Sequence, residues 1–123
     1  MYGVFVNDNG CIHYAALIVI GLKPIETRNR NTLKNLVGER VAIVRTRRNK
    51  KPVVVGYVTI TSAEFQSKDW LNENRDKTFI PVGSMYDCTK NGKWCYYLEN
   101  PETCMPYELP KDAIRHGFSY CEF

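Results

Sequence analysis

The stretch GLKPIETR, residues 21–28, gives the strongest indication of the fold. It follows an apolar run at residues 14–20, which predicts a short helix buried against a sheet. Gly21 stands where helices commonly end in a left-handed residue, and Pro24 lies three residues beyond, where it cannot continue a helix. We therefore expect a buried helix, a stop at Gly21 and a short strand over residues 25–28.

Three charged side chains lie in this stretch, namely Lys23, Glu26 and Arg28. Side chains alternate between the faces of a strand, so Glu26 and Arg28 should share one face and Thr27 should point to the other. Because the preceding helix is expected to be buried, these charges should begin near the core, at a cleft. A carboxylate between two cations would stay ionised and hold both in place. The same pattern also fits an ion-pair cluster that only fixes the corner between helix and strand.

The rest of the chain predicts short strands with scattered helices, which favours an α+β, mostly-β fold over a doubly wound sheet. We expect strands over residues 2–6, 40–45, 52–60, 79–82, 94–99 and 118–123, and an edge segment over residues 105–109. We expect helices over residues 33–37 (capped by Asn31 or Thr32 and ended by Gly38), from a capping box at residues 61–64 toward Arg75, and over residues 112–116. We expect a bulge or bend at Gly56, a tight hairpin turn at residues 90–93 and a strand break at Asn100-Pro101.

Length and composition are those of one ordinary globular domain, which we place at residues 1–123. The chain has 123 residues, of which 44% are hydrophobic and 24% are charged. Its N-terminal residues lack the pattern of a secretory signal, and the longest apolar stretch there, residues 15–20, is too short to span a bilayer. We therefore expect a cytoplasmic protein without a membrane partner.

Five cysteines and two histidines are the only soft metal ligands in the sequence. The cysteines are odd in number and irregularly spaced, and no pair has the spacing of a zinc-binding C-x-x-C motif. We therefore expect reduced cysteines, no metal and no cofactor. The sequence also lacks a P-loop, a GxSxG motif and an HExxH motif, and no pattern specifies an oligomeric state.

The positive charge of the chain is concentrated in one region. Residues 23–51 contain ten lysines and arginines against two acids, whereas the whole chain has a net charge of +4. The loop expected between the strands at 40–45 and 52–60 carries Arg47, Arg48 and Lys50. Such a cluster suits a phosphate-binding surface, because each cation near a phosphate releases a condensed counterion. A solvated surface without a ligand would show the same composition.

The motif Gly21-x-Lys23-x-x-Glu26-x-Arg28, preceded by an apolar helix, resembles the GxKxxExR signature of ASCH domains, a branch of the PUA-like superfamily. The Val-Gly-Tyr-Val of residues 55–58 is similar to a hydrophobic-Gly-x-hydrophobic strand of that family, and residues 94–100 resemble its aromatic-Leu-Glu-Asn strand. The resemblance implies a PUA-like mixed β-barrel with short flanking helices and a cleft beside the signature.

The family resemblance also implies a function, which is the binding of RNA or of a nucleotide-like small molecule. The cleft would then be lined by Lys23, Glu26 and Arg28, with phosphates held by Arg47, Arg48 and Lys50. A base would stack on an aromatic side chain of the later strand, for which Tyr97 is our candidate.

An alternative function is suggested by a branch that resembles ASCH barrels and removes the acetyl group from N4-acetylcytidine. That branch uses the signature lysine, a threonine at the position of Glu26 and a later glutamate, so the catalytic residues here would be Lys23, Glu26 and Glu99. Glutamate is a poor substitute for a hydroxyl nucleophile, and this difference favours binding over hydrolysis. A small hydrolase acting on a modified nucleoside or on RNA remains the alternative. A third reading is an interaction domain whose pocket is vestigial.

Overall fold

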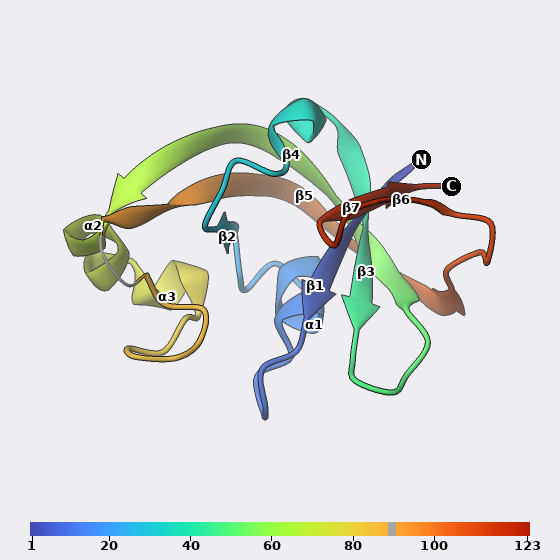
Figure 1. Cartoon of the computed structure of the whole chain (residues 1–123), viewed down its shortest axis with the longest axis horizontal. Coiled ribbons are helices and arrows are strands. Elements are labelled where there is room, and N and C mark those ends of the chain that lie inside the picture. The colour runs from blue at the N-terminus through green and yellow to red at the C-terminus, as the bar shows by residue number, and fades with distance from the viewer. Residues whose placement is uncertain (89–90) are drawn as a thin grey trace.

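Strands dominate the computed structural model, which describes residues 1–88 and 91–123. The strands are β1 (Tyr2–Asn7), β2 (Ile25–Arg28), β3 (Arg40–Thr46), β4 (Val53–Ser67), β5 (Gly92–Glu108), β6 (Ile114–His116) and β7 (Tyr120–Glu122) (Figure 1). The helices are α1 (Tyr14–Val19), α2 (Lys68–Glu73) and α3 (Arg75–Thr78), with a 3-10 turn, η1 (Lys34–Leu36). None of the helices in the described residues is long and apolar enough to cross a membrane.

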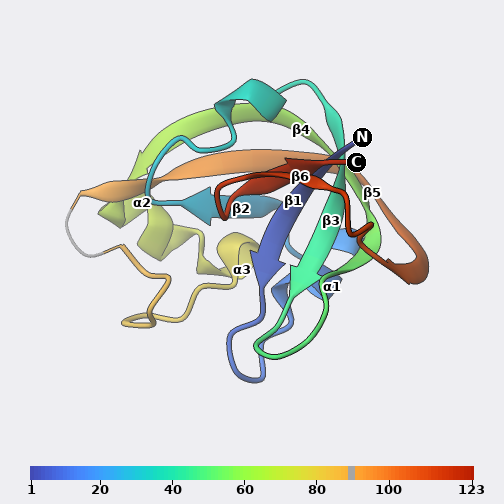
Figure 2. The ribbon, with the colours of Figure 1, turned by 45° about the vertical axis from the view of Figure 1, so that its right-hand side comes forward.

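All seven strands belong to one mixed sheet with the order β2-β5-β4-β3-β1-β7-β6. Strands β1 and β3 run parallel, and the other neighbours are antiparallel. The sheet is strongly curled, with β4 and β5 forming a long arch (Figures 1 and 2). It does not close, because the end strands β2 and β6 are not paired with each other in the described part of the chain. The expected α+β, mostly-β class is confirmed, and the closed barrel is wrong.

Helix α1 lies beneath the arch and packs against β1, β3, β4 and β5 (Figure 1). The residues that it buries are Tyr14, Ala15, Ile18 and Val19. The predicted helix stop is confirmed: Gly21 adopts φ +86°, and the next two backbone N–H groups both donate to Leu17 O at 3.0 Å. The predicted strand over residues 25–28 is also confirmed and becomes β2.

Two positions where a strand was predicted to end are wrong, because β4 and β5 continue past them. The segment from Thr61, predicted to start a helix, stays in β4 and pairs with β5 as far as Ser67. Ser67 caps α2 instead, where its Oγ accepts from the Trp70 N–H at 3.2 Å. Strand β5 passes through Asn100-Pro101 at a register shift, with Asn100 at φ +52°. At a bulge, the missing N–H of a proline costs no ladder hydrogen bond.

Three smaller predictions also differ from the structure. Residues 79–82 form no strand, since Phe79 takes a left-handed conformation that ends α3. Residues 112–116 form no helix, because β6 pairs with β7. The helix over residues 33–37 is the 3-10 turn η1, without the predicted side-chain cap. The predicted turn at residues 90–93 lies partly outside the described residues. The edge position of residues 105–109 is confirmed up to Glu108, because this end of β5 pairs with β4 alone.

Gly56 allows α1 to pack closely against the arch, and a bulge lies beside it as predicted. A Cβ at this position would lie 2.2 Å from Glu102 O and 2.7 Å from Val19 Cγ1. We expect Gly56→Ala to lower the free energy of unfolding by about 2 kcal/mol or more, because the backbone of β5 cannot easily move away. Urea denaturation measures this change.

Gly10→Ala is the control for this substitution. A Cβ at Gly10 meets nothing within 4 Å, so the variant suffers only the strain of φ +58°, about 1 kcal/mol. If both substitutions destabilised the protein equally, close contact with β5 and α1 would not be the reason for a glycine at position 56.

Candidate functional site

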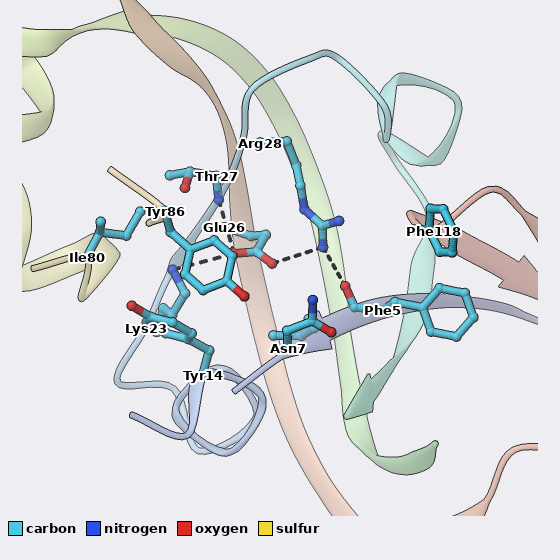
Figure 3. Close-up of a pocket in the computed structure, with 11 residues that line it drawn as sticks. Phe5, Asn7, Tyr14, Lys23, Glu26, Thr27, Arg28, Ile80, Tyr86 and Phe118 are labelled. Atoms are coloured by element: carbon cyan, nitrogen blue, oxygen red, sulfur yellow. Dashed lines mark hydrogen bonds and ion pairs between the residues drawn. The ribbon is translucent and has the colours of Figure 1, made fainter. Parts of the chain in front are cut away.

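A pocket of about 110 Å³ lies where the sheet fails to close, between β1 and β2 (Figure 3). Its wall combines charged, amide and aromatic side chains from five separate parts of the chain. The lining residues are Phe5, Val6, Asn7, Tyr14, Lys23, Glu26, Thr27, Arg28, Ile80, Tyr86 and Phe118. Lys23, Glu26 and Arg28 thus line one pocket in the structure.

The side chain of Lys23 is buried at the inner end of this pocket, with 1% of its surface exposed. Its Nζ donates to Ile25 O at 2.6 Å and to Thr78 O at 2.6 Å, and it lies 3.6 Å from Glu26 Oε1. The ring centroid of Tyr14 is 5.3 Å away. Burial lowers the pKa of Lys23, and the carboxylate of Glu26 opposes this shift. The three donors of the ammonium group are therefore directed at three partners.

Glu26 lies between the two cations of the signature. Its Oε1 accepts from the Thr27 N–H at 3.1 Å, and its Oε2 accepts from Arg28 Nη2 at 3.1 Å. Burial raises the pKa of the Glu26 carboxyl, but Arg28, Lys23 and the Thr27 amide together bring the pKa below its ordinary value. Glu26 is therefore ionised at neutral pH. The side chain of Thr27 lies on the other face of β2, as the strand alternation predicts (Figure 3).

Arg28 joins the two sides of the opening. Its Nη2 donates to Glu26 Oε2 within β2 and to the backbone oxygen of Phe5 in β1 at 2.6 Å. The Phe5 N–H donates to the backbone oxygen of Ser119, the residue before β7, at 3.1 Å. The Phe5 carbonyl oxygen accepts from Arg28. The arginine side chain thus occupies the position of a missing strand-to-strand contact (Figure 3).

A second buried lysine, Lys93, lies close enough to Lys23 that its positive charge lowers the pKa of Lys23. It is 3% exposed and donates to the backbone oxygen of Tyr86. Burial lowers the pKa of Lys93, and Glu26 opposes the shift. Sequence reasoning missed this residue, because it is the last residue of the predicted turn at residues 90–93, where a lysine side chain is expected to be exposed.

The basic loop, residues 47–51, begins beside the pocket. Asn7, which lines the pocket at the end of β1, accepts a hydrogen bond through Oδ1 from the Thr46 hydroxyl at the end of β3. Thr46 is the last residue of β3, so the loop that joins β3 to β4 starts at this hydrogen bond (Figure 1). The side chains of Arg47, Arg48 and Lys50 are exposed there. The parallel pairing of β1 and β3 therefore brings the start of the basic loop to Asn7 at the pocket, although none of residues 47–51 lines the pocket itself.

Besides the residues of the basic loop, two further predicted site residues do not line the pocket. Tyr97 packs against Trp70, with ring centroids 6.5 Å apart, and its hydroxyl accepts from Gln66. Glu99 is exposed on β5, opposite Thr59, so the structure does not bring its carboxylate to Lys23. The carboxylate beside Lys23 is that of Glu26.

The aromatic wall of the pocket comes from residues that sequence reasoning did not select. Tyr14 lies in α1, Tyr86 in the segment after α3, and Phe118 in the loop between β6 and β7. The rings of Tyr14 and Tyr86 meet edge to face at 6.0 Å. These residues are far apart in the sequence, and only the tertiary fold brings them together. In the described residues, no group of three or more histidine, cysteine or acidic side chains is arranged to hold a metal ion.

Comparison with known proteins gives structural matches alone, since no family model and no curated protein matches the sequence. The crystal structure of ASCH from Zymomonas mobilis matches with a TM-score of 0.65 and 17% identity, over 87% of this chain and 73% of that chain. A serine-to-alanine mutant of that protein matches with a TM-score of 0.65 and 18% identity, over 86% and 73%. A tyrosine-to-phenylalanine mutant matches with a TM-score of 0.63 and 19% identity, over 87% and 76%.

The charge of Glu26 should stabilise the folded protein, since it compensates two partly or fully buried cations. We expect Glu26→Gln to lower the free energy of unfolding by about 3 kcal/mol at neutral pH, the usual effect of breaking a buried ion pair. Because the folded-state pKa of Glu26 lies below its unfolded value, this stabilisation is complete above about pH 5 and is lost as the pH falls through the folded-state pKa. The difference from wild type should therefore shrink in acid.

Urea denaturation between about pH 3 and about pH 7 measures this difference. Glu99→Gln is the matched control: it removes the same charge from an exposed position and should leave stability within about 0.5 kcal/mol of wild type. A difference between Glu26→Gln and wild type that is the same at every pH would contradict the role given to the Glu26 charge.

Proposed function

The chain has the fold of an ASCH domain, and from this fold and its pocket we propose that the protein binds RNA or a nucleotide-like ligand between β1 and β2. The observation that carries the proposal is the pocket itself, which combines an ionised carboxylate, a guanidinium group and aromatic rings within reach of a basic loop. A base offers donors, acceptors and a flat face, and its phosphates offer negative charge. Each of these has a matching group in or beside the pocket.

The pocket presents hydrogen-bonding groups of both kinds. Arg28 uses Nη2 for its two hydrogen bonds within the described residues, which leaves other guanidinium N–H groups for a ligand. Asn7 accepts through Oδ1 from Thr46, and this contact turns its Nδ2 donor toward the pocket (Figure 3). Glu26 is ionised and keeps acceptor capacity beyond its protein partners. A base edge with an amino group and a ring acceptor is complementary to this set.

The basic loop would hold phosphates outside the pocket. Contacts from Arg47, Arg48 and Lys50 to phosphate oxygens would position a strand without reading its sequence. The proposal includes a cytoplasmic location, since reduced cysteines persist there and all five cysteines are free. A vestigial interaction domain is less consistent with the site, because Lys23 lies beside a cavity and two of its partners are backbone carbonyls.

Hydrolysis of a modified nucleoside or of RNA is the second candidate, supported by one observation. The pKa of Lys23 is lowered by burial, and a lysine with a lowered pKa beside a pocket is a typical general base. Against this role, the Nζ of Lys23 already donates to Ile25 O and Thr78 O, and Glu99 lies outside the pocket. Binding therefore accounts for more of the site than hydrolysis does.

We expect the affinity for a fluorescein-labelled single-stranded RNA, measured by anisotropy, to fall steeply between about 50 and about 200 mM salt. The double variant Arg47→Ala/Arg48→Ala should bind more weakly. It should also reduce the slope of log K against log salt by about 1.4, because about 0.7 counterions are released for each phosphate neutralised on a single strand.

The control for this measurement is Lys68→Ala/Lys77→Ala, which removes the same charge from exposed positions in α2 and α3. This control should reduce the slope by much less. An equal reduction in both double variants would show that net charge, and not the basic loop, determines the affinity.

We expect purified protein to leave N4-acetylcytidine unchanged when the reaction is followed by chromatography of the nucleosides. The reason is that Lys23 is engaged by backbone carbonyls and position 26 holds a carboxylate in place of a hydroxyl nucleophile. Release of cytidine that is abolished by Lys23→Met and retained in Glu99→Gln would instead establish the second candidate.

A further inference from the structure

Phe118 has an unusual position for an aromatic side chain. It lines the pocket, yet 96% of its surface is exposed, more than that of any other large apolar side chain in the described residues. A phenylalanine in this position contributes almost nothing to the core, since the stabilisation from an apolar side chain depends on the area removed from water. Core packing therefore gives no reason for a phenylalanine beside this charged pocket.

The backbone holds this ring at the pocket. Phe118 lies in the tight loop between β6 and β7, where Gly117 adopts φ +62° and His116 pairs with Tyr120. The next residue, Ser119, accepts a hydrogen bond from the Phe5 N–H at 3.1 Å. The loop is thus fixed to β1 on one side of the pocket, and the ring is presented from a paired hairpin.

The pocket has a second aromatic end. Tyr86 lies at the end opposite Phe118, and the Glu26–Arg28 pair lies between them (Figure 3). Unlike Phe118, Tyr86 is partly buried, packed edge to face against Tyr14. One end of the pocket is therefore an enclosed aromatic wall and the other an open aromatic surface, separated by a guanidinium group.

The volume of the pocket limits what it can enclose. Its volume of about 110 Å³ is below the about 300 to 1,000 Å³ of pockets that surround a whole drug-sized ligand. A nucleotide ligand would therefore have one base inside, with the rest of the molecule across the rim. Phe118 would then be the aromatic surface beside the part of the bound ligand that extends out of the pocket.

We propose that the site binds two consecutive nucleotides of a single strand, with one base enclosed against Tyr86 and its neighbour stacked on Phe118. The phosphate between them would lie over the free N–H groups of Arg28. This inference rests on the proposed nucleotide-binding function and specifies its ligand as an oligonucleotide.

The experiment compares ligands that differ by one nucleotide. The probes are the four nucleoside 5′-monophosphates and the four corresponding 5′-phosphorylated homodinucleotides, with dissociation constants measured by calorimetry. In the wild type, at least one dinucleotide should bind more tightly than its monophosphate. Phe118→Ala should weaken dinucleotide binding about tenfold, the effect of losing one stacked base, and leave monophosphate binding within about twofold. Phe118→Trp should retain the dinucleotide affinity.

Met105→Ala is the control, because Met105 is also exposed, at 87%, but lies on the far end of β5. It should change neither affinity. Equal loss for both classes of probe in Phe118→Ala would place the ring against the first base and overturn the second subsite. No loss for either class would overturn it as well, while the wild-type affinities would still support nucleotide binding. Absence of binding by the wild type would overturn the proposed function together with this inference.

Discussion

The hydrogen bond from Arg28 to the backbone oxygen of Phe5 is the constraint on which the site depends. Strand β7 occupies the edge of β1 at residues 2–4, so β2 cannot pair there and the curled sheet stays open. Beyond these residues, the Arg28 side chain extends from β2 to β1 and donates a hydrogen bond to the Phe5 carbonyl, which lies outside the paired positions of β7. Glu26 holds the guanidinium in this position from the same face of β2. The Arg28 side chain therefore sets the distance between β1 and β2 at this point, and the space between the two strands forms the pocket.

The charges around Glu26 explain why such an opening is stable. Burial would normally neutralise a carboxyl or an ammonium group, but the two cations of the signature and one peptide N–H keep Glu26 ionised. Lys23 in turn ties β2 to α3, since it bonds to Ile25 O at the start of β2 and to Thr78 O at the end of α3, and lies beside Glu26 in β2. Each charge is useful to the fold only while the others are present, because a lone buried charge would be strongly destabilising. The signature residues therefore form one structural unit.

Local rules predicted this unit well, because the helix stop, Pro24 and the alternation in β2 involve neighbours in the sequence. They failed where pairing between distant segments decides the structure. Residues 61–64 have the spacing of a capping box, yet six paired positions between residues 62–67 of β4 and strand β5 keep this segment in a strand. The prediction of Tyr97 rests on residue type and that of Glu99 on the family resemblance, whereas the structure packs Tyr97 against Trp70 and places Glu99 opposite Thr59. Tyr86 and Phe118 reach the pocket from loops, and no periodic pattern marks a loop residue as part of a site.

The arrangement of donors also bears on the choice between binding and catalysis. A lysine that acts as a base must lose a proton and then present a lone pair to the substrate. Lys23 faces two carbonyl oxygens at 2.6 Å and a carboxylate, all of which stabilise the protonated form. Deprotonation would leave two N–H donors for three buried acceptors and would turn the lone pair toward one of them, so the same contacts that hold β2 to α3 oppose the chemistry. The groups that remain free, on Arg28 and Asn7, are donors suited to recognition. The geometry that keeps the sheet open at β2 is therefore better suited to binding a ligand than to hydrolysing it.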